Sequence, residues 1–202
     1  MAKKRIAITG GIGSGKSTVV ALFRKMNYAV FSCDEIYAEL VKSKAYIEKI
    51  QTLFPAVVKN GVIDKQCLAE IVFNNAENRK KLNEIAHPLI MQTLVKRMDE
   101  CDGVVFAEVP LLFEGNYQSQ FDGIIVVVRD SQKRLEAIME RDCISETQAK
   151  QRLDAQFDYD SPLAKEIFSK NQTFLLDNNL SQNKLTEKVL EILQKLRLSS
   201  NL

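Results

Sequence analysis

A glycine-rich stretch near the N-terminus carries the residue types that bind phosphate groups. Residues 10–18 read GGIGSGKST and fit the pattern G-x-x-x-x-G-K-[ST]. Glycines at these positions let the backbone wrap around an anion, so that successive N–H groups point inward. Lys16 adds a positive charge for the β- and γ-phosphates, and the Ser17 hydroxyl can ligate Mg²⁺. This spacing predicts a binding site for ATP or GTP.

The elements expected around this stretch are those that a phosphate-binding loop requires. Residues 5–9 read as a strand, and residues 16–26 have the pattern of a helix. A helix that begins at the loop points the positive end of its dipole at a bound phosphate. Because a chance match in a glycine-rich turn would lack this context, we interpret the stretch as a nucleotide site.

Asp34 is a candidate for the acceptor side of a phosphoryl transfer. It follows the second expected strand, residues 28–31, and loops at that edge of an open α/β sheet line the ligand crevice. A carboxylate there can accept the proton of a hydroxyl that attacks the γ-phosphate. Ser32 and Glu35 have the spacing of a capping box, so Asp34 equally suits a first-turn position that complements a helix dipole. The residues alone leave both interpretations open.

Two short helices, at residues 131–141 and 145–156, form the candidate for a lid. Ser145 and Gln148 have capping-box spacing at the start of the second helix. Four arginines lie in or beside this pair: Arg129, Arg134, Arg141 and Arg152. An arginine on a mobile hairpin can neutralise charge on the transferring phosphoryl group. For each of these residues the alternative is an ordinary basic side chain on a surface helix.

The remaining pattern alternates strands with helices, which predicts a parallel sheet between layers of helices. Residues 104–109 and 124–128 are apolar runs of the kind found in strands covered on both faces, and residues 174–176 form the last expected strand. Residues 45–101 differ because they are mainly helical, with Val57-Val58 as their one strand candidate.

Several breaks are expected inside the helical block. The chain should interrupt its helices at Phe54-Pro55, turn at Asn60-Gly61, and interrupt them again at His87-Pro88. Asp64 can cap the helix that follows the turn. These signals predict several shorter helices.

Composition indicates an ordinary globular chain. The 202 residues are 46% hydrophobic and 27% charged, which suits one domain with, at most, an inserted lid. A net charge of +2 gives no strong attraction to nucleic acid or anionic lipid. Zinc sites need closely spaced cysteines and histidines, and this chain has four scattered cysteines and one histidine, so a zinc site is not expected. The same spacing gives no support for a disulfide framework. No apolar run suits a signal core or a membrane span, so we expect a cytoplasmic protein.

The phosphate-binding motif does not by itself define the reaction. A GTPase would need an N-K-x-D base reader, but Asn183-Lys184 is followed by Leu-Thr. A small-molecule kinase fits the length and the lid candidate. A nucleoside or nucleotide kinase shares every feature above, and a nucleotide-binding regulatory module without turnover is the alternative from another class.

Over nearly its whole length the chain resembles the dephospho-coenzyme A kinase family. Residues 9–18 match the family's TGGIGSGKST opening, and residues 34–36 resemble its D-x-I motif. Residues 85–90, IAHPLI, and residues 109–114, VPLLFE, are similar to its H-P-x-I and P-L-L-F-E segments. The pattern is completed by Arg141-Asp142, by Arg152 to Gln156 (R-x-x-A-Q), and by the asparagines after the last strand.

The resemblance implies an α/β, three-layer P-loop kinase fold with a five-stranded parallel sheet, a helical substrate-binding part and a helical lid. The core would comprise about 1–34, 102–130 and 172–202, the substrate-binding part about 35–101, and the lid about 131–156. The implied reaction is ATP-dependent phosphorylation of the ribose 3′-hydroxyl of dephospho-CoA, the last step of coenzyme A synthesis, with Mg²⁺. Dephospho-CoA and ATP would be its partners, without nucleic acid or membrane. The chain would be a monomer with at most weak self-association.

The resemblance also implies roles for individual residues. Lys16, Asp34 and Arg141 would be catalytic, and Ser17 would hold the metal ion. The nucleotide would contact Gly11, Ile12, Gly13, Ser14, Gly15, Lys16, Ser17, Thr18 and Asn178. The acceptor would be lined by Thr9, Asp34, His87, Pro88, Leu111, Glu114 and Arg152.

Two positions depart from the family pattern. Ala137 stands where the family often has an arginine, and Arg134 lies one turn away on a different helix face. Glu108 stands where an aspartate is common, and its longer carboxylate can still hold a Mg²⁺-bound water. The roles of Arg134 and Glu108 are therefore left open by the sequence.

Overall fold

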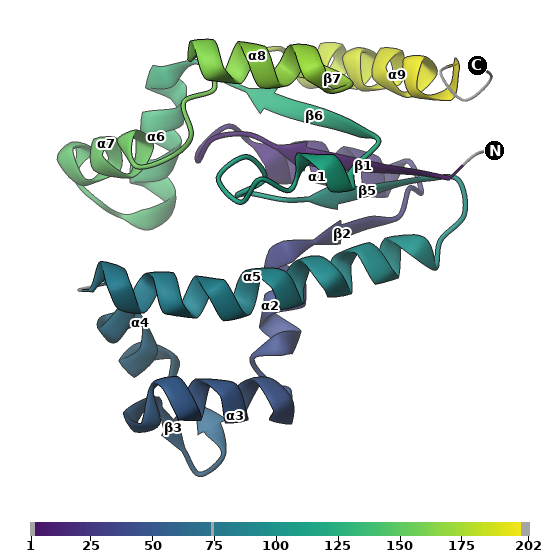
Figure 1. The fold of residues 1–202 in the computed structure, drawn as a ribbon. Helices are drawn as coiled ribbons and strands as arrows, with labels where there is room; N and C mark the ends of the chain where they lie inside the picture. The colour runs from purple at the N-terminus through teal and green to yellow at the C-terminus, as the bar shows by residue number, and fades with distance from the viewer. Residues whose placement is uncertain (1–2, 74, 199–202) are drawn as a thin grey trace. The chain divides into compact units, whose positions relative to one another are not determined.

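Five strands form one sheet in the order β2-β5-β1-β6-β7, seen in a computed structural model that describes residues 3–73 and 75–198 (Figure 1). The strands are β1 (Lys4–Thr9), β2 (Val30–Ser32), β5 (Val104–Glu108), β6 (Gly123–Val128) and β7 (Thr173–Asp177). β1 pairs in parallel with both β5 and β6, and β6 pairs in parallel with β7. The predicted α/β fold with a five-stranded parallel sheet is confirmed. The second strand lies about two residues later than expected.

The chain divides into two compact units. One holds the described residues up to Val30 and from Met98 onward, and the other is Phe31–Arg97. The helices of the first unit are α1 (Lys16–Lys25), α6 (Ser131–Asp142), α7 (Glu146–Asp154), α8 (Pro162–Lys170) and α9 (Gln182–Leu198). Those of the second are α2 (Cys33–Leu40), α3 (Lys44–Leu53), α4 (Lys65–Phe73) and most of α5 (Ala76–Asp99).

The core of the first unit explains why these apolar runs become strands. Side chains from α1 and α9 share one buried cluster with side chains from the strands: Ile6, Ile8, Val19, Phe23, Phe106, Ile125, Val127, Leu185, Val189 and Leu193. The strand residues that alternate with these, such as Ala7 and Val126, are also buried. Strands with both faces covered read as continuous apolar runs, which is the pattern that predicted them.

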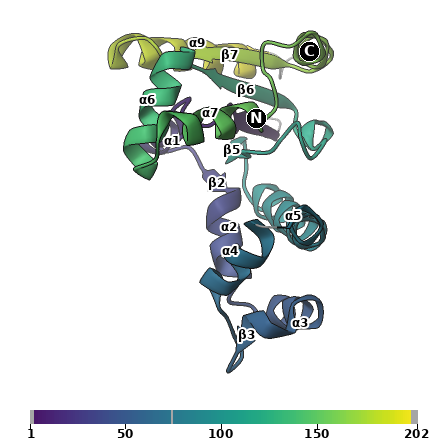
Figure 2. The same ribbon diagram turned by 90° about the vertical axis from the view of Figure 1, so that its left-hand side faces the viewer.

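The α6–α7 hairpin lies at the end of the sheet where the loop between β1 and α1 turns (Figures 1 and 2). It has a small core of its own, formed by Leu135, Ile138 and Ala149. Its second helix opens with the predicted capping box, in which the Ser145 hydroxyl accepts from the Gln148 N–H and the Gln148 side chain accepts from the Ser145 N–H. Helix α8 was not predicted.

The second unit contains a short hairpin among its helices. β3 (Val58–Lys59) pairs antiparallel with β4 (Val62–Ile63) after a 3₁₀ turn at Pro55–Val57. Asn60 and Gly61 have φ of 52° and 73°, the conformation that a tight hairpin turn requires. The Asp64 carboxylate accepts from the Cys67 N–H at 3.1 Å and so caps α4. The predicted turn and cap are both confirmed.

Two local predictions are wrong. Helix α5 continues through Pro88, although a break at His87-Pro88 was expected. Buried side chains on either side of the proline, Ala86 and Ile90, hold the helix together despite the missing N–H. Ser32 precedes α2, but its side chain makes no capping hydrogen bond, so the expected capping box does not form. Among the described residues, no helix combines the length and apolar character needed to cross a bilayer.

Candidate active site

The phosphate-binding loop, Gly10–Gly15, closes on itself at the start of α1. The Lys16 ammonium donates to the Gly10 carbonyl at 2.8 Å and to the Gly11 carbonyl at 3.2 Å. The Ser14 N–H donates to the Gly11 carbonyl at 3.1 Å. Phosphate oxygens carry more negative charge than these carbonyls, so a bound nucleotide can recruit the ammonium from them.

Two glycines of the loop are required by their surroundings. Gly10 has φ of 147°, and a Cβ there would overlap the Val127 carbonyl oxygen. Gly15 has φ of 86°, and a Cβ there would overlap the Asn178 amide nitrogen. Side chains cannot be accommodated at either position, because the backbone conformation and the close neighbours both exclude them. The two glycines therefore let Val127 and Asn178 approach the loop closely.

The apex of the loop is held at Ile12, through both its N–H group and its carbonyl group. The Ile12 N–H donates to Gln156 Oε1 at 2.6 Å, and the Ile12 carbonyl accepts from Arg134 Nε at 3.0 Å. The Ile12 side chain packs on the small core of the α6–α7 hairpin. Arg129 Nη1 donates to the next carbonyl, that of Gly13, at 3.2 Å. These contacts link the loop to the hairpin and to the end of β6.

The end of β7 supports the other side of the loop. Asn178 Nδ2 donates to the Ser14 carbonyl at 2.8 Å, and the Asn178 N–H donates to the Val128 carbonyl at 2.9 Å. Ser14 is buried, and its hydroxyl has no hydrogen-bond partner within the described parts of the chain. Asn178, predicted as a nucleotide-binding residue, thus contacts the loop backbone.

A segment after α7 contacts Thr9, the last residue of β1 before the loop. The Tyr159 hydroxyl lies 3.2 Å from Thr9 Oγ1, and Thr9 is fully buried. Burial raises the pKa of Tyr159 to about 12, so the phenol stays neutral at physiological pH. Its ring packs edge-on against Phe157 and Phe113. Glu114, predicted to line the acceptor, accepts from the Phe157 N–H at 3.1 Å.

An open pocket of about 390 Å³ lies beside the loop, within the first unit. Its lining is drawn from the loop, the carboxyl ends of β6 and β7, and the start of α6: Gly11, Ser14, Val127, Val128, Arg129, Asp130, Ser131, Arg134, Tyr159, Asp160, Asp177 and Asn179. The carboxyl ends of parallel strands are where α/β sheets bind ligands. The pocket has the position expected of a nucleotide site.

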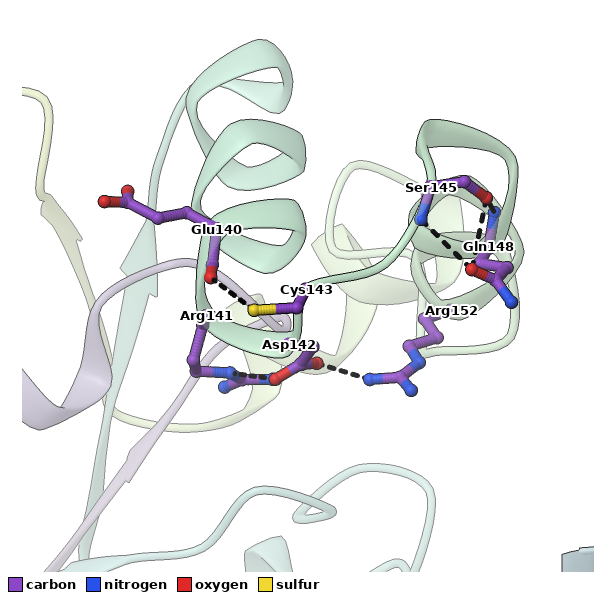
Figure 3. A network of polar contacts seen from close by, with 7 residues as sticks. All are labelled: Glu140, Arg141, Asp142, Cys143, Ser145, Gln148 and Arg152. Atoms are coloured by element: carbon purple, nitrogen blue, oxygen red, sulfur yellow. Dashed lines mark hydrogen bonds and ion pairs between the residues drawn. The ribbon is translucent and has the colours of Figure 1, made fainter.

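Arg141 is paired with its neighbour Asp142 rather than with the loop (Figure 3). Arg141 Nε and Nη2 donate to the two oxygens of Asp142 at 2.7 and 2.9 Å, and Arg152 Nη1 donates to the same carboxylate. The Arg141 hydrogen bond holds the pKa of Asp142 below its ordinary value. The Arg141 side chain is 61% exposed. Two predicted site arginines therefore share one carboxylate.

The second unit, taken by itself, holds three predicted acceptor residues. Asp34 is exposed in the first turn of α2, and no hydrogen bond or ion pair involves its side chain within the described ranges. His87 is half-buried on α5, and burial lowers its pKa below the ordinary 6.5. Pro88 is exposed on the same helix. Leu111, one of the acceptor candidates in the first unit, is 39% exposed.

The structure adds residues that the sequence could not assign. Gln156 stood in a family motif without a role, and it binds the Ile12 N–H. Arg134 and Arg129 were named as hairpin arginines, and both donate to loop carbonyls. Tyr159 was missed, because nothing in the sequence marks a tyrosine 150 residues from Thr9 as its partner. Ser17 and Thr18 are exposed in the first turn of α1, as a ligand site requires.

A glycine-rich loop that joins the central strand of a parallel sheet to a helix, with a basic helical hairpin beside it, defines a P-loop kinase fold. A family model described as Dephospho-CoA kinase matches residues 4–183. The chain belongs to the dephospho-CoA kinase family.

Individual relatives agree with this assignment. A dephospho-CoA kinase of Geobacillus kaustophilus is 35% identical over 197 residues, which cover 94% of this chain and 95% of the relative. A crystal structure of TT1252 from Thermus thermophilus has a TM-score of 0.80 at 31% identity, covering 96% of this chain and 98% of that one. A dephospho-CoA kinase structure from Campylobacter jejuni has a TM-score of 0.63 at 26% identity, covering 95% and 96%.

Proposed function

We propose that this chain transfers the γ-phosphoryl group of ATP to the ribose 3′-hydroxyl of dephospho-CoA, giving coenzyme A and ADP. The observation that carries the proposal is a closed phosphate-binding loop in a chain of the dephospho-CoA kinase family. The loop supplies the nucleotide half of the reaction, and the family supplies the acceptor. The transfer needs an attacking hydroxyl, a positively charged cradle and a leaving ADP.

The nucleotide half rests on the loop and on α1. N–H groups of the loop and of the first turn of α1, such as those of Gly13, Gly15 and Ser17, supply donors for the phosphates. Lys16 turns from the loop carbonyls to the β- and γ-phosphates. Asn178 keeps the loop in shape through the Ser14 carbonyl. The backbone donors are fixed by the loop before the ligand binds, and the Lys16 side chain is the donor that moves.

The residues present fit a Mg²⁺ ion held jointly with the nucleotide. Ser17 is exposed in the first turn of α1, next to the lysine that serves the phosphates. Mg²⁺ keeps several waters and binds through one or two protein oxygens plus substrate phosphates. Ser17 would supply such an oxygen, and the bound ion would neutralise charge on the β- and γ-phosphates.

On the acceptor side, the residues keep the roles that the family resemblance implies. Asp34 accepts the proton of the 3′-hydroxyl as it attacks, and its exposed carboxylate is accessible for this task. The acceptor is lined by Thr9, His87, Pro88, Leu111, Glu114 and Arg152. The helical residues 35–101 form the substrate-binding part, and residues 131–156 form the lid.

Arg141 completes the site when the lid closes. Its guanidinium exchanges the Asp142 carboxylate for an oxygen of the transferring phosphoryl group, a stronger anion. Closure excludes water that would otherwise hydrolyse ATP. We place the enzyme in the cytoplasm as a monomer, acting on free ATP and dephospho-CoA.

A coupled ADP-release assay with a panel of acceptors tests this function. Dephospho-CoA should give turnover, while nucleosides and nucleoside monophosphates should give ADP no faster than water does. Preferred turnover of a nucleoside or monophosphate would assign the chain to another kinase reaction. Tight ATP binding without ADP release for any acceptor would indicate a nucleotide-binding module.

A further inference from the structure

Arg134, near the start of α6, contacts three consecutive residues of the phosphate-binding loop. Its Nε donates to the Ile12 carbonyl at 3.0 Å. Its main-chain carbonyl lies 2.6 Å from the position of a Cβ on Gly13, and its guanidinium occupies the space of a side chain on Gly11. The arginine and the two glycines fit one another, so the loop itself fixes the place of the guanidinium.

The rest of this guanidinium is unused by the protein. Within residues 3–73 and 75–198, neither Nη1 nor Nη2 of Arg134 makes a hydrogen bond or an ion pair. The side chain is half-buried and lines the open pocket with Gly11 and Ser14. Burial lowers the pKa of the guanidinium, while Tyr159 and Asp160 act in the opposite direction. An arginine remains charged throughout the physiological range, so an unpaired cation faces this pocket.

The other charged groups that line the pocket are Arg129 and three aspartates, and none of these carboxylates forms a hydrogen bond or ion pair with Arg134 among the described residues. Arg129 adds a second guanidinium, which donates to the Gly13 carbonyl and whose buried Nε has no hydrogen-bond partner among the described residues. Asp130 already caps α6 by accepting from the N–H groups of Gln132 and Lys133. Asp160 and Asp177 also line the pocket, without a hydrogen bond or ion pair to Arg134.

We propose that Arg134 binds the β- and γ-phosphates of the nucleotide directly, through the nitrogens that its bond to Ile12 leaves unused. This rests on the proposed function, since it takes ATP to be the ligand of the loop. A planar guanidinium fixed by Nε presents its remaining N–H groups in one direction, which suits two oxygens of a polyphosphate. The same side chain then joins the loop backbone to the ligand that the loop surrounds.

Calorimetric titration of ATP and of AMP, without acceptor, tests this assignment. Arg134→Ala should weaken ATP binding at least about tenfold, because a charge-assisted contact is lost. It should leave the affinity for AMP within about twofold, since AMP lacks the β- and γ-phosphates. Arg134→Lys should fall between wild type and Arg134→Ala, because it keeps the charge without the planar fork.

Lys133→Ala is the matched control, because it removes one positive charge from the adjacent, exposed position of the same helix. It should bind ATP and AMP like wild type. ATP binding by Arg134→Ala within about twofold of wild type, or an equal loss for ATP and AMP, would overturn the proposal. If Arg134→Ala fails to fold, the same criteria apply to Arg134→Lys. Wild type that binds no ATP would instead contradict the proposed function, so the two failures differ.

Discussion

The phosphate-binding loop and the helical unit Phe31–Arg97 hold their candidate residues in opposite ways. Each peptide at the loop apex is engaged by a side chain from another element, including Gln156, Arg134 and Arg129. In the helical unit, Asp34 and Pro88 are exposed on helices whose stability comes from other residues. The loop is therefore held in shape before any ligand binds, while Asp34 and Pro88 are side chains that the fold of the helical unit can spare.

The largest expected effect comes from removing the lysine of the phosphate-binding motif. Lys16→Met should lower turnover by about 10²- to 10³-fold, because it removes a charge that stabilises the transferring phosphoryl group. In the free protein Lys16 donates hydrogen bonds to two loop carbonyls, and the loss of these two bonds should leave the circular dichroism spectrum unchanged. Lys25→Met, at the other end of the same helix, is the control and should keep wild-type turnover. Normal turnover in Lys16→Met, or loss of the fold, would contradict the role.

A second substitution tests the acceptor half. Asp34→Asn keeps the size of the side chain and removes the base, so turnover should fall by about 10²-fold. ATP affinity and the unfolding midpoint should change little, since Asp34 is exposed. Glu35→Gln, in the same helical turn, should leave the rate near wild type. Full turnover in Asp34→Asn would favour the interpretation of Asp34 as a helix-dipole residue.

The hairpin gives a third, smaller test, because its arginine must leave Asp142 to act. Arg141→Ala should lower turnover by about tenfold or more, and Arg141→Lys by less, because lysine keeps the charge without the planar fork. Neither variant should lower stability much, since the Arg141 side chain is mostly exposed. Lys150→Ala on α7 is the control. Normal turnover in Arg141→Ala would leave the hairpin as a pair of surface helices.

The smallest effect concerns the stability of the helical unit. Burial lowers the pKa of His87 in the folded chain, so the unfolded chain binds a proton more readily. The free energy of unfolding should therefore fall as the pH drops below about 6.5, the ordinary pKa of histidine. His87→Gln should lose this part of the pH dependence in denaturant titrations. Because His87 is the single histidine of the chain, identical curves for both proteins would contradict the shift.

Sequence reasoning recovered the fold wherever a local signal agreed with the packing. The apolar runs at 104–109 and 124–128 became strands covered on both faces, and Asn60-Gly61 became the turn that its residues favour. It failed where tertiary contacts decide. Pro88 did not stop α5, because buried neighbours hold the helix on both sides. Helix α8 carried a usable signal that was overlooked: the Ser161 hydroxyl accepts from the Ala164 N–H, and Pro162 takes the first helical position.

The same distinction between local signals and tertiary contacts holds for the candidate site. The motif predicted the loop and its lysine because the chemistry is encoded in consecutive residues. Arg134, Gln156 and Tyr159 reach the loop from more than 100 residues away, and spacing along the chain carries no sign of such contacts. The sequence marks Arg134 as one of the hairpin arginines and as a neighbour of Ala137, but its contact with Ile12 is visible in the structure alone.

In the proposed reaction, the loop directs a phosphoryl group to one hydroxyl of dephospho-CoA. Steady-state ADP release with dephospho-CoA, compared with its 3′-deoxy analogue at the same concentration, tests whether that hydroxyl is the acceptor. We expect rapid ADP release with dephospho-CoA and only background hydrolysis with the analogue, which lacks the attacking oxygen. Equal rates with both compounds, or no ADP from dephospho-CoA while ATP is bound, would contradict the account.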